Sequence, residues 1–282
     1  AENMNLDIES STFGAAEDNG ATPEIIEHGN FSSFGGGAVY ASATSESGGA
    51  RVSITSSSFD SNVAEGEGGG AIMAVGEVTM MITRSLFSQN RAGDGGPGCG
   101  GAIYLNNSAG TSVADSVFVD NGASRSGGAI ASQTCQSLLE DGGPPFDAAR
   151  LSVLRSRFTL NHTERYGGAI DARRLQVTAS QFTGNRAQSV AGGAISARSL
   201  TAEGPVVLVG NRFIENRLDD EDPIGRPCLG VGGGGAVYLS SDAATPTVRP
   251  TVLSTSPASL TSTEYASTCC PVEWLRVGAG LR

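Results

Sequence analysis

The chain has 282 residues, with 29 acidic against 18 basic residues and a formal net charge of −11. Such a negative charge disfavours a nucleic-acid partner, whose phosphates attract basic surfaces. Every basic residue is Arg, and the absence of Lys excludes Schiff-base and lysine general-base catalysis. Forty glycines and 6% aromatic residues suit a thin core with many corners.

The first element expected in chain order lies at residues 6–13, and its pattern recurs along the chain. Two apolar residues stand two apart, a Ser follows three residues later, and a Phe comes two after the Ser, as in Val52, Ile54, Ser57 and Phe59. Apolar residues two apart indicate a strand with one buried face. The step from Ile54 to Ser57 breaks this alternation, so we expect a bend there and then a second short strand. The same pattern predicts strand pairs at residues 80–87, 111–118, 151–158, 175–182 and 206–213.

In the six copies of this pattern after residues 6–13, the Phe begins a Phe-x-x-Asn motif. Asn tolerates left-handed backbone geometry and can bond its own main chain, so we expect each Asn to turn the chain. Equivalent residues of stacked coils lie above one another, so the motif predicts one buried column of Phe and one of Asn. The columns comprise Phe59, Phe87, Phe118, Phe158, Phe182 and Phe213, and Asn62, Asn90, Asn121, Asn161, Asn185 and Asn216.

A Gly-Gly-Ala-Ile or Gly-Gly-Ala-Val block between these motifs predicts a third strand. Paired glycines allow a corner with positive φ, and their lack of side chains lets successive coils approach closely. The blocks begin at Gly36, Gly69, Gly100, Gly127, Gly167, Gly192 and Gly234. Three short strands per unit of 25 to 42 residues predict an all-β fold, a single-stranded right-handed parallel β-helix of about seven coils. At about 4.8 Å per coil, the rod would be about 34 Å long.

We expect this rod to span residues 1–239. A tail rich in Ser, Thr and Pro follows at residues 240–282, with Trp274 in a short closing segment. Two rival repeat folds fit less well. A leucine-rich or ankyrin array needs a helical period that no stretch sustains. A propeller blade needs roughly 40 to 50 residues, but the shortest unit, from Gly167 to Gly192, is only 25 residues long.

Parallel β-helices can carry glycan-cleaving sites on an outer sheet, so the outward positions beside the glycine blocks are the first to check. These positions are Tyr40, Met73, Tyr104, Ala131, Asp171, Ser196 and Tyr238. Glycoside hydrolysis needs two carboxylates across the bond, and Asp171 is the one acidic residue among them. Asp171 with Arg173 and Arg174 resembles a lyase acid and base, but a solvated ion pair is the simpler interpretation. We therefore expect no catalytic residues.

An acidic loop, Asp219-Asp220-Glu221-Asp222, is the one candidate metal site in the sequence. Clustered carboxylates are hard oxygen ligands of the kind that Ca²⁺ prefers. Asp219, Asp220 and Asp222 are therefore candidate ligands of a structural calcium ion. The alternative is an exposed acidic loop without metal, which we favour. We expect no other cofactor.

Five cysteines leave at least one without a partner inside the chain. Disulfides are expected if the protein is secreted, with Cys228 and the tail pair Cys269-Cys270 as the first candidates. Two insertions, at residues 91–99 and 217–228, leave the rod at one corner and return through Pro and Cys, and a third, at 133–149 with Cys135, leaves from another. Such insertions often build a binding face. Three sequons, at Asn30, Asn106 and Asn161, could carry glycans in a secretory host.

The strand pattern is already in progress at residues 6–13, so the chain begins in the middle of a coil. A solenoid without a polar cap exposes strand edges and core-facing apolar groups. We therefore expect other polypeptide to stack on the N-terminal coil. No stretch of about 18 apolar residues could cross a membrane.

The alternation of Gly-Gly-Ala-Ile with Phe-x-x-Asn over residues 6–239 resembles the repeat of chlamydial polymorphic membrane proteins. It is also similar to the secreted right-handed β-helix proteins of the pectin-lyase-like class. The first resemblance implies a β-helical adhesin, the passenger region of an autotransporter. The shared motif residues belong to the scaffold, so no catalytic residue is implied.

Together these observations predict a non-catalytic extracellular or cell-surface rod that serves adhesion or structural assembly, with a glycan as a further partner. The alternative is a polysaccharide lyase or glycoside hydrolase of the same fold. An enzyme should place several acidic and basic side chains on neighbouring coils of one sheet, and the fold alone does not separate the two.

Overall fold

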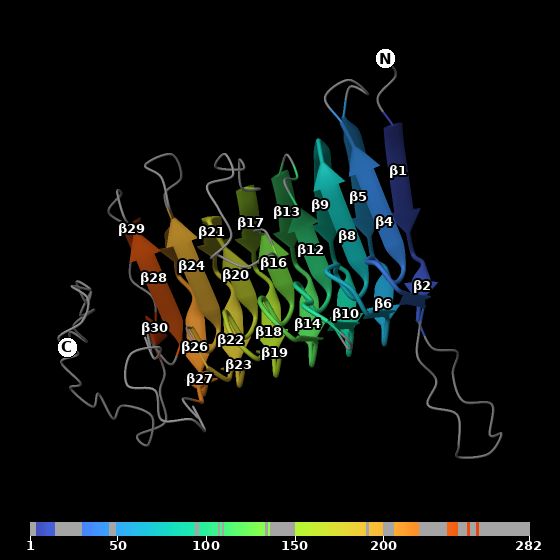
Figure 1. Cartoon of the computed structure of the whole chain (residues 1–282). Helices are drawn as coiled ribbons and strands as arrows, with labels where there is room; N and C mark the ends of the chain where they lie inside the picture. The colour runs from blue at the N-terminus through green and yellow to red at the C-terminus, as the bar shows by residue number, and fades with distance from the viewer. Residues whose placement is uncertain are drawn as a thin grey trace, which may run out of the picture.

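A computed structural model describes residues 4–14, 30–44, 49–93, 96–106, 108, 110–132, 135, 150–189, 192–199, 206–219, 236–241, 247–248 and 252–253. Within these residues every regular element is a β-strand, and every pairing between strands is parallel. The strands form four sheets that run along the rod, which we name A to D. The chain is a right-handed parallel β-helix of about seven coils (Figure 1).

Sheets A and B hold eight strands each. Sheet A comprises β1 (Met4–Glu9), β5 (Ala50–Thr55), β9 (Val78–Thr83), β13 (Gly110–Ala114), β17 (Arg150–Leu154), β21 (Arg174–Thr178), β25 (Val207–Val209) and β29 (Thr247–Val248). Sheet B comprises β2 (Thr12–Phe13), β6 (Ser58–Asp60), β10 (Leu86–Ser88), β14 (Val117–Val119), β18 (Arg157–Thr159), β22 (Gln181–Thr183), β26 (Arg212–Ile214) and β30 (Val252–Leu253).

Sheets C and D hold seven strands each. Sheet C comprises β3 (Phe31–Ser32), β7 (Val63–Ala64), β11 (Arg91–Ala92), β15 (Gly122–Ala123), β19 (His162–Thr163), β23 (Arg186–Ala187) and β27 (Arg217–Leu218). Sheet D comprises β4 (Val39–Ala43), β8 (Ile72–Gly76), β12 (Ile103–Asn106), β16 (Ile130–Ser132), β20 (Ile170–Ala172), β24 (Ile195–Ser199) and β28 (Val237–Ser241).

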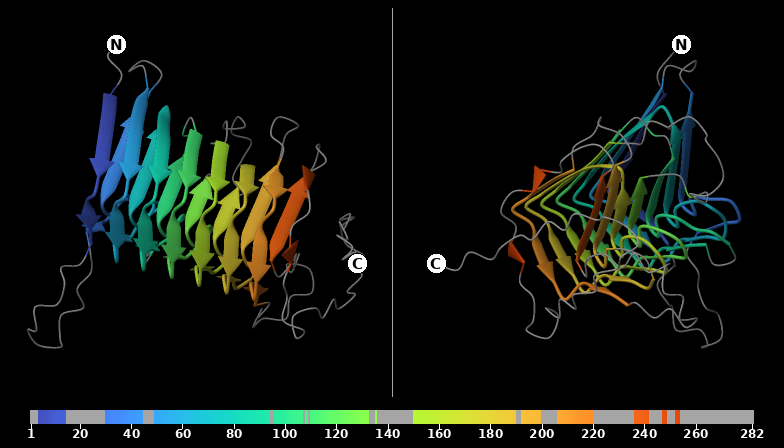
Figure 2. Two further views of the ribbon diagram at one scale, coloured as in Figure 1. Left: turned by 180° about the vertical axis from the view of Figure 1, so that it is seen from behind. Right: turned by 60° about the vertical axis from the view of Figure 1, so that its left-hand side comes forward.

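Each coil passes through sheets A, B, C and D in turn, so the expectation of three strands per coil was wrong (Figure 2). The additional strand is the two-residue strand of sheet C, such as Val63–Ala64. Two residues are too few to show an alternating pattern, and the inward one is a small residue such as Ala64 or Ala92. The hydrophobic period that reveals sheets A, B and D is therefore missing from sheet C.

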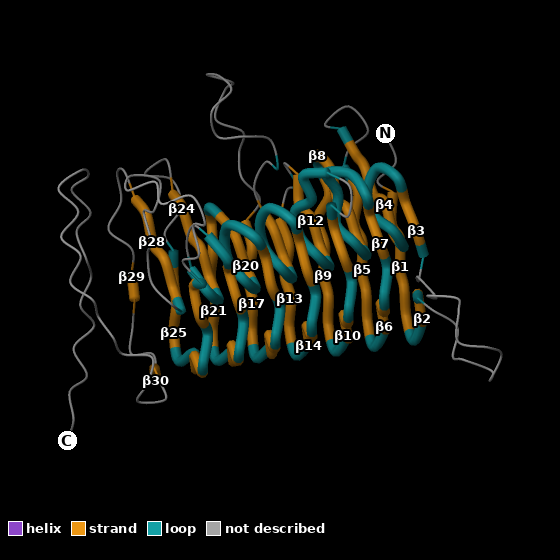
Figure 3. Tube along the Cα trace, turned by 60° about the horizontal axis from the view of Figure 1, so that its bottom comes forward, coloured by secondary structure: helices purple, strands orange, loops and turns teal. Residues whose placement is uncertain are grey.

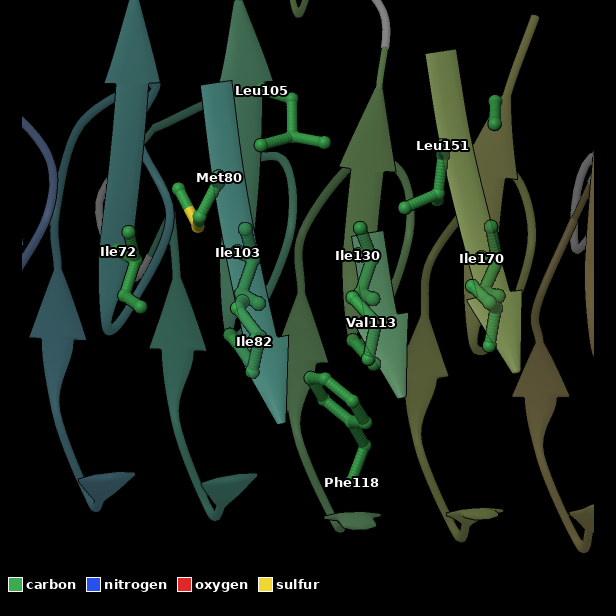
Figure 4. Packing of buried hydrophobic residues seen from close by; sticks show 14 of the residues in the cluster. Ile72, Met80, Ile82, Ile103, Leu105, Val113, Phe118, Ile130, Leu151 and Ile170 are labelled. Carbon is green, nitrogen blue, oxygen red and sulfur yellow. The ribbon is translucent and has the colours of Figure 1, made fainter. Parts of the chain in front are cut away.

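The core fills the inside of the coils, where residues that share a register position lie above one another (Figure 4). Sheet D contributes a column of Ile that is fully buried, made of Ile72, Ile103, Ile130, Ile170 and Ile195. Sheet A contributes Ile54, Ile82, Val113, Val153, Val177 and Leu208. Burying one such side chain stabilises the fold by about 1.5–3 kcal/mol. The stacking of coils, and not any single coil, therefore encloses the core.

Two corners of each coil are turned by a residue in the left-handed region, and the Asn of the motif is not that residue. At the corner between sheets A and B it is the residue before the Ser, such as Ser56 with φ 50°. At the corner between sheets B and C it is the residue before the Asn, such as Ser61 with φ 54°. The expectation that the Asn itself adopts this geometry was wrong, because its side chain is used between coils. The stacked turns are visible in Figure 3.

The glycine blocks turn the corner before sheet D, as expected. The first Gly of the block has positive φ in most coils, for example Gly127 with φ 61°. The second has no room for a side chain, because a Cβ on Gly128 would overlap the carbonyl oxygen of Gly168 in the next coil. At Gly127 a Cβ would likewise overlap the carbonyl oxygen of Ile130, so the lack of space, together with the positive φ of the first Gly, favours glycine at both positions.

Strand pairing continues past residue 239, where the tail was expected to begin. Strands β29 and β30 pair with β25 and β26 and so prolong sheets A and B. Trp274 lies outside the described residues. In the described part of the chain, no helix has the length and apolar character needed to span a membrane.

Candidate functional site

The Phe column runs along the inside of sheet B. Its rings are parallel, with centroids 4.8–4.9 Å apart and interplanar angles of 3–12°. The column comprises Phe59, Phe87, Phe118, Phe158, Phe182 and Phe213, and Phe13 of the first coil extends it. Each stacked pair adds about 0.5–1.5 kcal/mol beyond burial. Sheet B is thus fixed in register by its side chains as well as by its backbone.

The Asn column is a continuous chain of hydrogen bonds, and Asn121 shows its pattern. Its Oδ1 accepts bonds from the backbone N–H of Asn90 at 3.0 Å and from Asn90 Nδ2 at 2.9 Å. Its Nδ2 donates to the carbonyl oxygen of Phe87 and to Oδ1 of Asn161. The same pattern recurs at Asn62, Asn90, Asn161 and Asn185, with Asn30 as the first member of the column. Asn216 is the last member, accepting from Asn185 and donating to the carbonyl oxygen of Phe182. The side chains therefore join neighbouring coils at a corner where the backbone ladder is interrupted.

A third column, of Ser residues, was present in the sequence pattern but was not recognised as a ladder. The Oγ of Ser85 accepts a bond from the N–H of Ser57 in the preceding coil and donates to the carbonyl oxygen of Thr83. The column comprises Ser57, Ser85, Ser116, Ser156 and Ser180. Asn211 ends it, accepting from the N–H of Ser180 through Oδ1. The recurrence of Ser two residues before Phe was the available signal.

The outer face of sheet D is covered, although the sequence pattern marked it as outward. Met73, Tyr104, Ala131, Cys99 and Cys135 form a second apolar cluster outside the rod. Within this cluster Cys99 and Cys135 are joined by a disulfide, and their Cα atoms are 5.7 Å apart. This disulfide was not predicted. The candidates Cys228, Cys269 and Cys270 lie outside the described residues.

Tyr104 is held rigidly in this outer cluster. Its Oη accepts a hydrogen bond of 2.9 Å from the backbone N–H of Cys135. Burial raises the pKa of the Tyr104 phenol to about 12, with the bond from Cys135 acting in the opposite direction and the charge of Glu67 adding to the rise. The phenol therefore remains neutral at physiological pH and acts here as a packing group.

Asp171 is fully buried, so the expectation that its carboxylate is exposed to solvent was wrong. It continues the covered column of sheet D, in register with Ala131 on one side and Ser196 on the other, and both neighbours are buried as well. Among the described outward positions, Tyr40 at the first coil remains exposed. No second carboxylate lies beside Asp171 in this column. Glycoside cleavage uses two carboxylates across the bond, and Asp171 is the one acid at the described outward positions of this column.

The outer face of sheet C carries a column of basic residues: Arg91, His162, Arg186 and Arg217. Gly122 lies between Arg91 and His162 in register, and a Cβ there would meet the His162 ring at 2.5 Å. The absence of a side chain at Gly122 therefore makes room for the imidazole. The Asp120 carboxylate compensates the positive charge of this part of the column. It lies 3.4 Å from the Arg91 guanidinium and 3.8 Å from His162 Nδ1.

The imidazole of His162 should make the fold less stable in mild acid. Burial lowers the pKa of His162, the charges of Arg91 and Arg186 lower it further, and Asp120 opposes the shift. The folded state then binds a proton more weakly than the unfolded chain, whose His titrates near about pH 6.5. Stability should therefore fall as the pH drops below that value.

Urea unfolding at about pH 7.5 and pH 5.5 measures this loss in the wild type and in His162→Gln. The variant should lose less stability between the two pH values. His28 is present in both proteins, so it does not affect the difference. An equal loss in both proteins would contradict this role of His162.

Of the three candidate calcium ligands, Asp219 lies within the described residues. The Asp219 carboxylate is paired with the guanidinium groups of Arg186 and Arg217, the latter at 3.4 Å. A calcium ion would have to compete with both cations for these oxygens. Asp220 and Asp222 lie outside the described residues, and no group of three or more His, Cys, Asp or Glu in the described part could hold a metal ion.

The three sequons differ in accessibility. Asn161 is fully buried, and its amide donates to the carbonyl oxygen of Phe118 and to Oδ1 of Asn185. It cannot carry a glycan in the folded rod. Asn30 is exposed, although its amide donates to Oδ1 of Asn62, and Asn106 is half-buried at the end of β12.

Comparison with known proteins finds one family likeness. The repeat described as Chlamydia polymorphic membrane protein (Chlamydia_PMP) repeat matches residues 84–106. This segment holds Phe87, Asn90, Cys99 and the following glycine block, so it covers one motif unit of the rod. No curated protein and no solved structure matches the chain.

Proposed function

We propose that this chain is a non-catalytic rod, exposed outside the cell or on its surface, that serves adhesion. The repeat likeness supports a surface protein of the polymorphic membrane protein kind. The Cys99–Cys135 disulfide supports it independently, because disulfides form and persist in oxidising compartments outside the cytosol. We also propose that the rod belongs to the pectin-lyase-like class of right-handed β-helix proteins.

The observation that carries the proposal is the use of polar side chains inside the scaffold. The buried Asn and Ser side chains form hydrogen bonds between neighbouring coils. The Asp171 carboxylate of sheet D is buried, in register with Ala131 and Ser196. A rigid rod with varied outer side chains suits contact with large partners. A protein or glycan on another cell surface is such a partner.

Two experiments test this function separately: one measures whether the chain is exposed on intact cells, and the other measures adhesion. Antibodies against the purified chain should label unpermeabilised cells of the source organism, and external protease should remove the label. Beads coated with the folded chain should bind to cell monolayers more than beads coated with the Asn121→Ala variant. Periodate treatment of the monolayer separates a glycan ligand from a protein ligand. A label that needs permeabilisation, or equal binding of both kinds of bead, would contradict the proposal.

The enzymatic alternative has its own test at Asp171. We expect no depolymerisation of pectin or alginate by the purified chain, because its one carboxylate on sheet D is buried. Release of reducing ends or unsaturated products measures such activity. Asp171→Asn is the variant to compare, since it keeps the size of the buried side chain. Cleavage by the wild type that Asp171→Asn abolishes would establish the enzyme and overturn the adhesin proposal.

A further inference from the structure

One residue of the Asn column, Asn121, is set apart by the residue that follows it, which is Gly122. The other Asn residues of the column are followed by residues that carry a side chain: Phe31, Val63, Arg91, His162, Arg186 and Arg217. A Gly in this place lets its backbone nitrogen reach the preceding side-chain amide most easily, because no Cβ hinders the approach. The scaffold therefore contains an Asn-Gly dipeptide, the sequence most prone to deamidation.

Gly122 is present because of its neighbour in the next coil. It lies in register with His162 on sheet C, and a Cβ at Gly122 would meet the imidazole Nε2 at 2.5 Å and Cε1 at 2.7 Å. A larger residue would therefore compete with the ring for the same space. The dipeptide that is prone to deamidation follows from the way in which sheet C accommodates the imidazole.

The folded rod keeps the two reacting groups apart. Deamidation requires the Gly122 nitrogen to attack Cγ of Asn121, but this N–H donates a hydrogen bond of 2.9 Å to the carbonyl oxygen of Asn90. The Asn121 side chain is fully buried, and hydrogen bonds fix it to both neighbouring coils. Its Cγ cannot turn toward the nitrogen unless these bonds break. Hydrogen bonds in a core open only about as often as the whole domain unfolds.

We propose that Asn121-Gly122 is a modification site that reacts in the unfolded chain and makes unfolding of the rod irreversible. The Gly122 nitrogen loses its proton and forms a bond to Asn121 Cγ, the bond from Cγ to Nδ2 breaks, and ammonia leaves. The product is a cyclic succinimide. Water then opens the ring at either of its carbonyls, which gives Asp or isoaspartate. Water is the only co-reactant, and nothing is oxidised or reduced.

Either product should prevent the coils from stacking again. An Asp at position 121 has no N–H in its side chain, so the carbonyl oxygen of Phe87 and Oδ1 of Asn161 would lose their donor. Its negative charge would also be buried beside these acceptors. Isoaspartate lengthens the main chain by one carbon and would shift β15 out of register with β11 and β19. A chain that stays unfolded long enough to react is therefore lost from the folded population.

Peptide mapping by mass spectrometry tests the site and its protection. The wild type is incubated at mildly alkaline pH with and without urea. In urea, Asn121 should convert as fast as Asn19, which also precedes a Gly. It should convert faster than Asn185, which occupies the same column but precedes Arg186. Without urea, Asn121 should convert at least about 1,000-fold more slowly, because the unfolding free energy keeps the open state rare. Conversion of Asn121 at the same rate with and without urea, or in urea only as fast as Asn185, would overturn the proposal.

Refolding of the incubated wild type tests the consequence. After dilution from urea, size-exclusion chromatography separates folded chains from aggregates. Chains modified at Asn121 should be depleted from the folded fraction at least about 10-fold, because they leave buried groups without bonds. An equal share of modified chains in both fractions would show that the column tolerates the change, and would contradict irreversible unfolding.

A pair of variants separates the dipeptide from the imidazole. Gly122→Ala combined with His162→Ala removes the dipeptide together with the ring that the new Cβ would meet. His162→Ala alone is the matched control, because it loses the ring and keeps the dipeptide. Recovery of the fold after long incubation in urea is compared with that of the same protein unfolded briefly. The double variant should keep its recovery, whereas the control and the wild type should lose theirs. Equal losses in the control and the double variant would assign the irreversibility to another cause and refute the role of this site.

Discussion

Replacing Gly128 with Ala should prevent the rod from folding. A Cβ at this position would overlap the carbonyl oxygen of Gly168 and crowd the backbone of His162 at 2.5–2.6 Å. These are main-chain atoms of the next coil, so no side-chain rotation relieves the overlap. The coils would have to separate and lose their ladder on both sides. We expect a cost of more than about 4 kcal/mol, which is a large part of the stability of a domain.

Gly110→Ala is the matched control for this experiment. Gly110 lies on sheet A, and its nearest neighbour for an added Cβ is the carbonyl oxygen of Arg150 at an ordinary 3.8 Å. Circular dichroism and urea unfolding should show a folded Gly110→Ala protein close to the wild type and an unfolded or aggregated Gly128→Ala protein. Equal stability of the two variants would mean that the coils are less closely packed than the structure has them.

Replacing Asn121 with Ala should be nearly as damaging. The substitution removes the acceptor for the N–H and Nδ2 of Asn90 and the donor to the carbonyl oxygen of Phe87, and these groups lie in the dry interior. Each buried polar group left without a bond costs about 1–3 kcal/mol, so the total for these three groups should be about 3–9 kcal/mol. Urea unfolding measures this loss.

The same chemical change at Asn5 gives the control. Asn5 lies at an exposed position of β1, so Asn5→Ala should alter stability by less than about 0.5 kcal/mol. If Asn121→Ala were as mild as Asn5→Ala, the Asn column would be a consequence of the fold and not one of its causes. A second substitution at Asn185 would then be expected to be mild as well.

These two predictions concern the scaffold, and they explain why the repeat motif says little about activity. The glycine blocks bring the coils together, and the Phe, Asn and Ser columns bond them. All of these residues face inward or turn corners, so partners meet other side chains. The outer columns and the disulfide-linked segments are therefore where function should be sought.

The local pattern of the chain was sufficient for the architecture. Apolar residues two apart, a Phe at constant spacing and paired glycines recur with the period of one coil, so any member predicts the place of the others. Short-range chemistry decides these positions: a strand face must be apolar, and a corner against another backbone must be Gly. Sheet C was not predicted, because a strand of two residues has no period. The Ser column was visible as a repeat, but its bonds to the next coil depend on stacking.

Tertiary structure decided what covers the rod. The strand pattern places the residues beside the glycine blocks on the outer face, whether or not other residues cover that face. The sequence alone therefore predicts that Asp171 is exposed to solvent. Only the fold shows that Cys99 and Cys135 are joined by a disulfide and pack with Met73 and Tyr104 in one cluster on the outer face of sheet D. These contacts join residues 36 apart in the chain through loops that carry no repeat. Periodicity determines the coil, whereas the covering of its faces depends on long-range contacts that periodicity does not encode.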